Sequence, residues 1–213
     1  YNFYQQLKLK KIDLPIGYTA EHDPISELIL VTVNDNEKLA IFPGRQIATA
    51  ERLEALALLT HQQFVDNLPL EQTLQNIKAS NGIAVLNWGL GKWLYPRSKV
   101  VYRAARNGDN HPLCLGDSSL RPWFWPEPIF LKLARLYSLP ILAGSDPLNF
   151  KGEERLIGKY GIVSKTQINL ADINSSVKKI LADPSSFSIA GKRNSTIRAF
   201  YRQMKTLRKP IRC

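Results

Sequence analysis

The stretch LPILAGSDP, residues 139–147, passes without a break from an apolar run into Gly144, Ser145 and Asp146. The same transition occurs twice earlier, in GIAVLNWG over residues 82–89 and in LCLGDSS over residues 113–119. A short apolar run bounded by glycine and polar residues is typical of a buried strand. We therefore expect three buried strands, each of which ends at a polar loop.

Helical patterns alternate with these strands. Elements are predicted, in chain order, at residues 27–33 and 38–42 (a hairpin), 70–81 (helix), 82–86 (strand), 112–115 (strand), 128–137 (helix), 140–143 (strand), 160–164 (strand) and 172–181 (helix). Strands that alternate with helices favour βαβ units. The sequence therefore predicts an α/β fold with a mainly parallel sheet or barrel.

The loops after the three strands hold the candidate site. Carboxyl ends of parallel strands lie on one face of such a fold, where ligands usually bind. The candidates for ligand binding are Asn87, Trp88, Lys92, Arg97, Arg121 and Ser145, with Asp117 and Asp146 as catalytic acid/base residues or metal ligands. Two plainer alternatives stay open: turn and helix-cap chemistry, or an ion-pair network that ties the loops together.

Length and composition predict one large domain over residues 1–190. The chain has 213 residues, 44% of them hydrophobic, which is enough for a proper core. It contains no run of about 18 apolar residues, so we expect no transmembrane segment. Cys114 and Cys213 lie far apart and form neither a disulfide framework nor a zinc motif. A reducing cytoplasm fits this cysteine usage.

Residues 191–213 predict a basic amphipathic C-terminal helix. From Ser186 onward there are eight basic residues and no acidic one, out of a net charge of +11. Ile197, Tyr201 and Met204 recur at helical spacing. The helix either docks by this apolar stripe with its cationic face in solvent, or binds an acidic partner, nucleic acid or a membrane surface.

Four segments between Ile41 and Phe150 resemble, in order and context, motifs of the polymerase-and-histidinol-phosphatase (PHP) superfamily of metal-dependent hydrolases. They are Phe42–Ile47, Glu51–Leu59, Gly82–Gly89 and Ala143–Asp146. The resemblance implies a distorted or incomplete (β/α)7 TIM-like barrel. Since 213 residues is short for a full barrel, a fragment that lacks the first strand is an alternative.

The family's metal ligands match this chain at few positions. Asp146 matches, but Gln46 stands where the family has a bridging glutamate, and Trp88 and Leu148 stand at histidine positions. Tryptophan and leucine offer a metal no lone pair. The resemblance places His22 in a ligand motif, with a surface polar role as the alternative.

Two classes of function follow. The first is a PHP-like, phosphoesterase-like hydrolase with a degenerate site, in which Asp146, His22 and His61 hold one or two zinc, manganese or magnesium ions, or none. His61 enters because it follows the apolar residues 56–59 at a strand end. The second class is a noncatalytic binding protein that uses the crevice and the basic tail for an anionic ligand. In the first class, Lys92, Arg97 and Arg121 would clamp the anion or phosphoester.

Four tryptophans fall in or beside these loops. They are Trp88, Trp93, Trp123 and Trp125. They predict either a packed lid over the strand ends or a stacking surface for a sugar or base.

Overall fold

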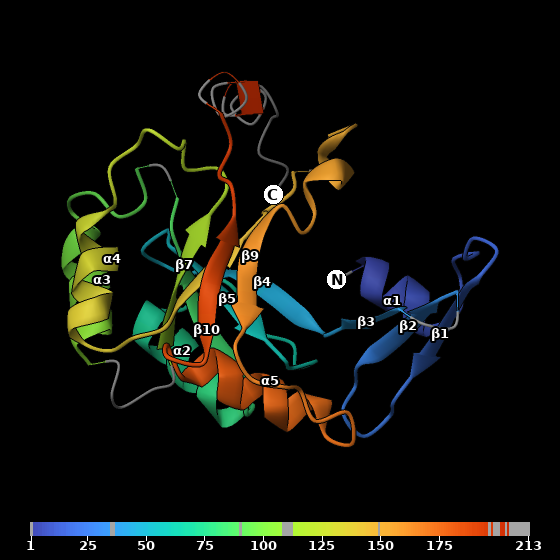
Figure 1. The fold of residues 1–213 in the computed structure, drawn as a ribbon. Helices are drawn as coiled ribbons and strands as arrows, with labels where there is room; N and C mark the ends of the chain where they lie inside the picture. The colour runs from blue at the N-terminus through green and yellow to red at the C-terminus, as the bar shows by residue number, and fades with distance from the viewer. Residues whose placement is uncertain are drawn as a thin grey trace.

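The computed structural model describes residues 2–34, 37–89, 91–107, 113–148 and 150–195, together with residues 197, 201, 202 and 204. Its central sheet contains, in spatial order, β4 (Gly44–Ala48), β5 (Glu54–Leu58), β6 (Ile83–Asn87), β7 (Leu113–Ser118) and β8 (Ile141–Gly144). Its helices are α1 (Asn2–Lys8), α2 (Leu70–Ala79), α3 (Ser98–Arg106), α4 (Ile129–Leu136), α5 (Ile173–Ala182) and the short 3-10 helix η2 (Glu153–Leu156). Figure 1 shows their arrangement.

The three strands that end in polar loops are parallel neighbours, as the sequence predicts. β6 pairs with β7, and β7 pairs with β8, both in parallel. Helices α3 and α4 make the two crossovers, and both pack on the same face of the sheet. A crossover helix is the usual way to join parallel strands.

The predicted parallel barrel is wrong. β4–β5 and β5–β6 are antiparallel pairs, so the five-stranded sheet is mixed, and the other strands form separate antiparallel sheets. Among the described strands, β4 and β8 are the edges of the central sheet and do not pair with each other to close it. The molecule is therefore an α/β protein with an open mixed sheet.

A returning segment explains why β5 and β6 are antiparallel although α2 lies between them. Residues 59–69 run back beside β4: Leu59 N–H donates to Pro43 O at 3.0 Å, and Asn67 N–H donates to Ala48 O at 2.7 Å. This segment returns the chain to the level of the start of β5 before α2 begins. Helix α2 then leads the chain to the level of the end of β5, so β6 starts beside that end.

The sheet separates two apolar cores. Helices α2, α3 and α4 cover one face, where Ile77, Val101 and Leu131 pack against strand residues such as Leu86 and Leu115. Figure 1 shows α3 and α4 side by side on this flank. Because strands β6, β7 and β8 have buried residues on both faces, their sequences are nearly continuously apolar.

The opposite face is covered only in part. α5 and the antiparallel pair β9 (Tyr160–Ser164) and β10 (Phe187–Gly191) pack there through Ile180 and Phe187 against Val85, Cys114 and Leu142. Burial raises the pKa of the Cys114 thiol to about 12. This thiol therefore stays protonated and acts as a small packed side chain rather than a nucleophile.

The N-terminal residues form a small layer of their own. β1 (Tyr18–His22), β2 (Ile29–Val33) and β3 (Glu37–Ile41) form an antiparallel sheet, which includes the predicted hairpin. α1 packs on it through Tyr4 and Leu7. Asn174 on α5 donates a hydrogen bond to Ser26 O and so ties this layer to the rest of the molecule.

In the described part of the C-terminal segment, two residues of the predicted apolar stripe are largely exposed. Ile197 is 83% exposed and Tyr201 55%, whereas Arg202 is fully buried. The Arg202 guanidinium lies 2.7 Å from the Glu153 carboxylate and donates to Asp146 O at 2.5 Å. Arg202 therefore anchors the described part of this segment. Arg198, Lys205, Arg208, Lys209, Arg212 and Cys213 lie outside the described residues.

We expect Arg202→Met to lower the free energy of unfolding by about 3–5 kcal/mol, because Glu153 would keep a buried charge without its cation. Urea denaturation measures this loss. Ile197→Ser, at an exposed neighbouring position, should change stability by less than about 0.5 kcal/mol. Equal stability of the two variants would show that Arg202 does not anchor the segment.

Candidate functional site

The parallel pairing of β6, β7 and β8 brings three polar loops to one edge of the sheet. Asn87 pairs with Gly116, Asp117 with Ala143, and Ser118 with Gly144. Asn87, Asp117 and Gly144 therefore lie at the ends of adjacent strands, and Ser145 and Asp146 follow directly after Gly144.

A cavity of about 220 Å³ opens at this edge, on the face of the sheet that α5 covers in part. We call it the strand-end pocket. Its polar lining consists of Gln46, Asn87, Asp117, Ser118 and Asp146, and its apolar lining of Leu56, Leu58, Val85, Leu142 and Ala143 with two glycines. Gln46 comes from β4, which is antiparallel to β5, and so reaches the pocket from outside the βαβ units.

Asp117 is the most constrained polar group of the pocket. It is 3% exposed, and Arg121 donates to both of its oxygens, from Nε at 2.8 Å and from a terminal nitrogen at 2.5 Å. The Tyr160 hydroxyl donates to it at 2.7 Å. Such a bidentate, charge-assisted pair is strong and geometrically specific. The Asp117 carboxylate is therefore neutralised inside the protein.

The two partners of Asp117, Arg121 and Tyr160, both have raised pKa values. Burial alone would lower the pKa of Arg121, but the hydrogen bond and the charge of Asp117 raise it above its ordinary value. Burial first, and then the hydrogen bond to Asp117, raise the pKa of Tyr160. Arg121 also donates to Trp125 O at 3.1 Å, which holds the loop after β7. This is the ion-pair network that the sequence left open as an alternative.

Asp146 faces the pocket with fewer partners. Its carboxylate accepts a hydrogen bond of 2.7 Å from the Ser118 hydroxyl, and its backbone has a positive φ of 46°. Aspartate tolerates this left-handed conformation better than most residues. The neighbouring Ser145 donates instead to Tyr160 O at 3.0 Å, which ties its loop to β9.

The predicted anion clamps are occupied by protein groups. Lys92 forms an ion pair with Glu54 on β5. Arg97 donates to Gly91 O at 2.9 Å and to Arg52 O at 3.5 Å, so it ties two loops together. Neither residue lines the strand-end pocket, and Arg121 is held by Asp117.

The aromatic residues divide into two groups. Trp88 and Trp93 are buried in the core under the helices, and Trp93 packs edge-on against Phe130 with ring centroids 5.9 Å apart. Trp123 and Trp125 are exposed, at 64% and 40%. None of the four lines the strand-end pocket.

The three predicted metal ligands, His22, His61 and Asp146, do not lie together in the structure. His22 lies on β1 in the N-terminal sheet, 3.1 Å from the Glu27 carboxylate. His61 follows β5, whose end lies beside the start of β6, at the opposite edge from the pocket. Within the described residues, no three His, Cys, Asp or Glu side chains gather as metal ligands. Asp146 thus lacks the second and third ligands that the hydrolase hypothesis requires.

Two pocket residues were missed as candidate ligands. From the sequence alone, Gln46 is considered only as the replacement of a metal-binding glutamate. Ser118 is not named there as a candidate, although it directly follows the candidate Asp117. Gly116 also shapes the pocket, because a Cβ there would lie 2.5 Å from the Asn87 side-chain oxygen. The glycine therefore makes room for the Asn87 amide.

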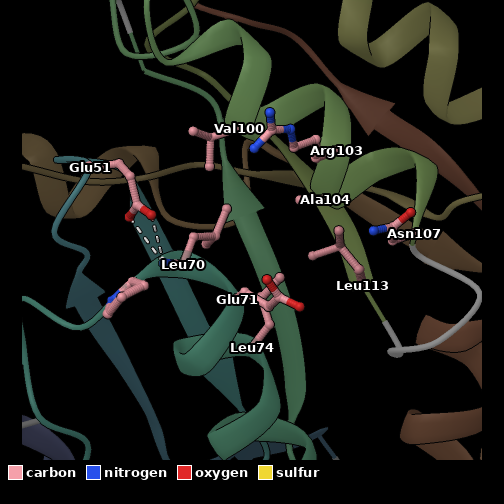
Figure 2. Close-up of a pocket in the computed structure, with 10 residues that line it drawn as sticks. Glu51, Leu70, Glu71, Leu74, Val100, Arg103, Ala104, Asn107 and Leu113 are labelled. Atoms are coloured by element: carbon pink, nitrogen blue, oxygen red, sulfur yellow. Dashed lines mark hydrogen bonds between the residues drawn. The ribbon is translucent and has the colours of Figure 1, made fainter.

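A second cavity, of about 230 Å³, lies on the helical face of the sheet (Figure 2). Its polar lining includes the Glu51 carboxylate, which accepts hydrogen bonds of 3.0 and 3.1 Å from the Leu70 N–H at the start of α2. Such a carboxylate satisfies a free backbone donor and offsets the helix dipole. Glu51 therefore has a structural role as a cap.

Comparisons with known proteins assign no family. No family model matches the chain, and no curated protein matches it. The resemblance to the PHP superfamily accordingly stays a prediction from sequence. No described helix is long and apolar enough to cross a membrane.

We expect the stability of the protein to fall as the pH rises above 10, the ordinary pKa of tyrosine, because Tyr160 has a raised pKa in the folded state. Above that pH the unfolded chain loses the Tyr160 proton, whereas the folded chain retains it. The stabilisation is therefore complete below pH 10 and is lost above it. Urea denaturation across this pH range measures the slope.

Tyr160→Phe should make this slope shallower. It should also lower stability at neutral pH by about 1–3 kcal/mol, because Asp117 loses a hydrogen-bond donor. Tyr18→Phe, on an exposed strand, is the matched control. The same alkaline slope in both variants would contradict the assignment to Tyr160.

Proposed function

We propose that the protein is a noncatalytic binding protein whose strand-end pocket takes a small, uncharged molecule rich in hydroxyl groups. One observation supports this most directly. The groups that line the pocket and lack a hydrogen bond to the described residues are the Gln46 and Asn87 amides and one Asp146 oxygen, whereas Asp117 is neutralised by Arg121.

The chemistry of these groups suits hydroxyls. Each amide offers two N–H donors and a carbonyl acceptor, and a carboxylate oxygen accepts. A hydroxyl group both donates and accepts, so it can pair with either kind of group. The aliphatic side chains of Leu56, Val85 and Leu142 would contact the carbon framework of the ligand.

The size of the pocket limits the ligand. At about 220 Å³ the cavity is smaller than the roughly 300 Å³ at which pockets for drug-sized molecules begin. A monosaccharide or a cyclic polyol is a molecule of suitable size. This comparison favours one sugar ring over an oligosaccharide.

The charges around the pocket disfavour an anion at this position. The nearby cations Lys92 and Arg121 each have a carboxylate partner, which leaves Asp146 as the unbalanced charge. A negative ligand would be repelled by Asp146 without a cation to offset it. The proposal therefore differs from the phosphoester that the sequence suggested, and it assumes the cytoplasmic location expected from the cysteines.

The proposal predicts saturable binding of at least one member of a panel of glucose, mannose, N-acetylglucosamine and myo-inositol, measured by calorimetry. Asn87→Leu should weaken that binding roughly tenfold, because one or two hydrogen bonds of about 1 kcal/mol each are lost. Asp146→Asn tests the charge separately, since it keeps the shape of the side chain.

Gln62→Leu is the matched control, because Gln62 is exposed at the opposite edge of the sheet. It should bind the same sugar as well as the unmodified protein does. Failure of the whole panel to bind would refute the proposal. Equal weakening in Gln62→Leu and Asn87→Leu would also do so.

A further inference from the structure

We infer that a third pocket, beside the start of β9 and the end of β10, is a binding site for a phosphate group. This inference goes beyond the proposed function and concerns different residues. The cavity measures about 410 Å³, and we call it the cationic pocket. It is lined by Ser119, Leu156, Lys159, Tyr160, Gly191, Lys192, Arg193, Asn194 and Ser195.

The charge of the lining carries the inference. Lys159, Lys192 and Arg193 line the cavity, and no carboxylate does. Neither lysine forms an ion pair with any described residue. The strand-end pocket is the opposite case, because Asp117 and Asp146 line it and no lysine or arginine does. Unbalanced cations that share one concave surface raise the local concentration of anions.

The backbone fixes the two lysines beside each other. Tyr160 pairs with Gly191 in the β9–β10 ladder, and Lys192 N–H donates to Lys159 O at 3.0 Å. Gly191 has a φ of +86°, and a Cβ there would collide with Lys159 O. Only glycine permits this approach, so the ladder places two cations at one end of the β9–β10 pair.

Hydrogen bonds also fix the other wall of the cavity. Asn194 donates to Ser119 O from its side chain at 2.9 Å and from its backbone at 3.2 Å. Arg193 donates to Trp123 O at 3.0 Å and to Pro122 O at 3.4 Å. These bonds hold Arg193 against the loop after β7 without neutralising its charge. The wall is therefore formed before a ligand arrives, which reduces the entropy lost on binding.

Phosphate suits this lining better than a carboxylate does. A phosphate group carries up to two charges and several acceptor oxygens, which matches two free lysines, an arginine and the Ser195 hydroxyl. The lysines act as point charges and the serine as a hydrogen-bond donor. A concave pocket of this size favours a small phosphate compound over an extended polyanion.

The experiment measures binding of inorganic phosphate to the full chain by calorimetry at constant ionic strength. We expect saturable binding that weakens as chloride is raised. The double variant Lys159→Gln, Lys192→Gln should weaken it at least about tenfold, because two of the three charges are removed. In nuclear magnetic resonance spectra, phosphate should shift the amide signals of Lys192 and Asn194 more than that of Asn87.

The matched control is the double variant Lys38→Gln, Lys132→Gln. It removes the same charge from exposed lysines on β3 and α4, which do not line this cavity. It should bind phosphate like the unmodified protein. An equal loss in both double variants would overturn the site, because binding would then depend only on net charge.

Two further arms identify the source of the phosphate. Glucose 6-phosphate and phosphatidylcholine vesicles that contain phosphatidic acid present the same group on a soluble molecule and on a lipid. Competition of either with inorganic phosphate, lost in the Lys159, Lys192 variant, supports the site and names its source. Binding of vesicles or of an oligothymidylate without any binding of inorganic phosphate would overturn it.

The inference and the proposed function can fail separately. Asn87→Leu should leave phosphate binding unchanged, and the double lysine variant should leave sugar binding unchanged, because the two pockets have no lining residue in common. Loss of phosphate binding in Asn87→Leu would contradict the cationic pocket as a separate site.

Discussion

The buried Asp117 carboxylate is the group on which the arrangement of the loops depends. A charge at this depth destabilises the protein unless it is paired and hydrogen-bonded. Arg121 and Tyr160 supply those partners, and they come from the loop after β7 and from β9. Arg121, which this carboxylate fixes in place, also donates a hydrogen bond to Trp125 O. One requirement for charge balance therefore joins the central sheet, the loop after β7 and strand β9.

Tyr160 also separates two pockets of different character. Its hydroxyl bonds to Asp117, which lines the strand-end pocket, while Tyr160 itself lines the cationic pocket. On the first side no lysine or arginine lines the cavity, and its polar lining includes two amides and the carboxylates of Asp117 and Asp146. On the second side lysines face the cavity without a carboxylate. The ligands proposed for the two pockets follow from this division of charge.

Local patterns in the sequence were enough to predict much of the fold. The apolar runs before Asn87, Asp117 and Ser145 identified three parallel strands, and their order placed Asp117 and Asp146 at one edge. The barrel was wrong because residues 59–69 run back beside β4, a course set by backbone hydrogen bonds that leave no periodic signal. The burial of Arg202 could not be predicted either, because its partner Glu153 lies far away in sequence. The pairing of Lys92 with Glu54 is a contact of the same kind.

The contact between Arg202 and Asp146 has a consequence for the order in which the protein is made. The two residues are 56 positions apart, and the donor is the later one. A nascent chain emerges from the ribosome with its N-terminal part first. The sheet strands β4–β8 can thus pair while Arg202 is still unsynthesised, and the loop that carries Asp146 acquires its last hydrogen bond only afterwards. The bond that Arg202 donates to Asp146 O therefore forms only after the sheet strands have been synthesised.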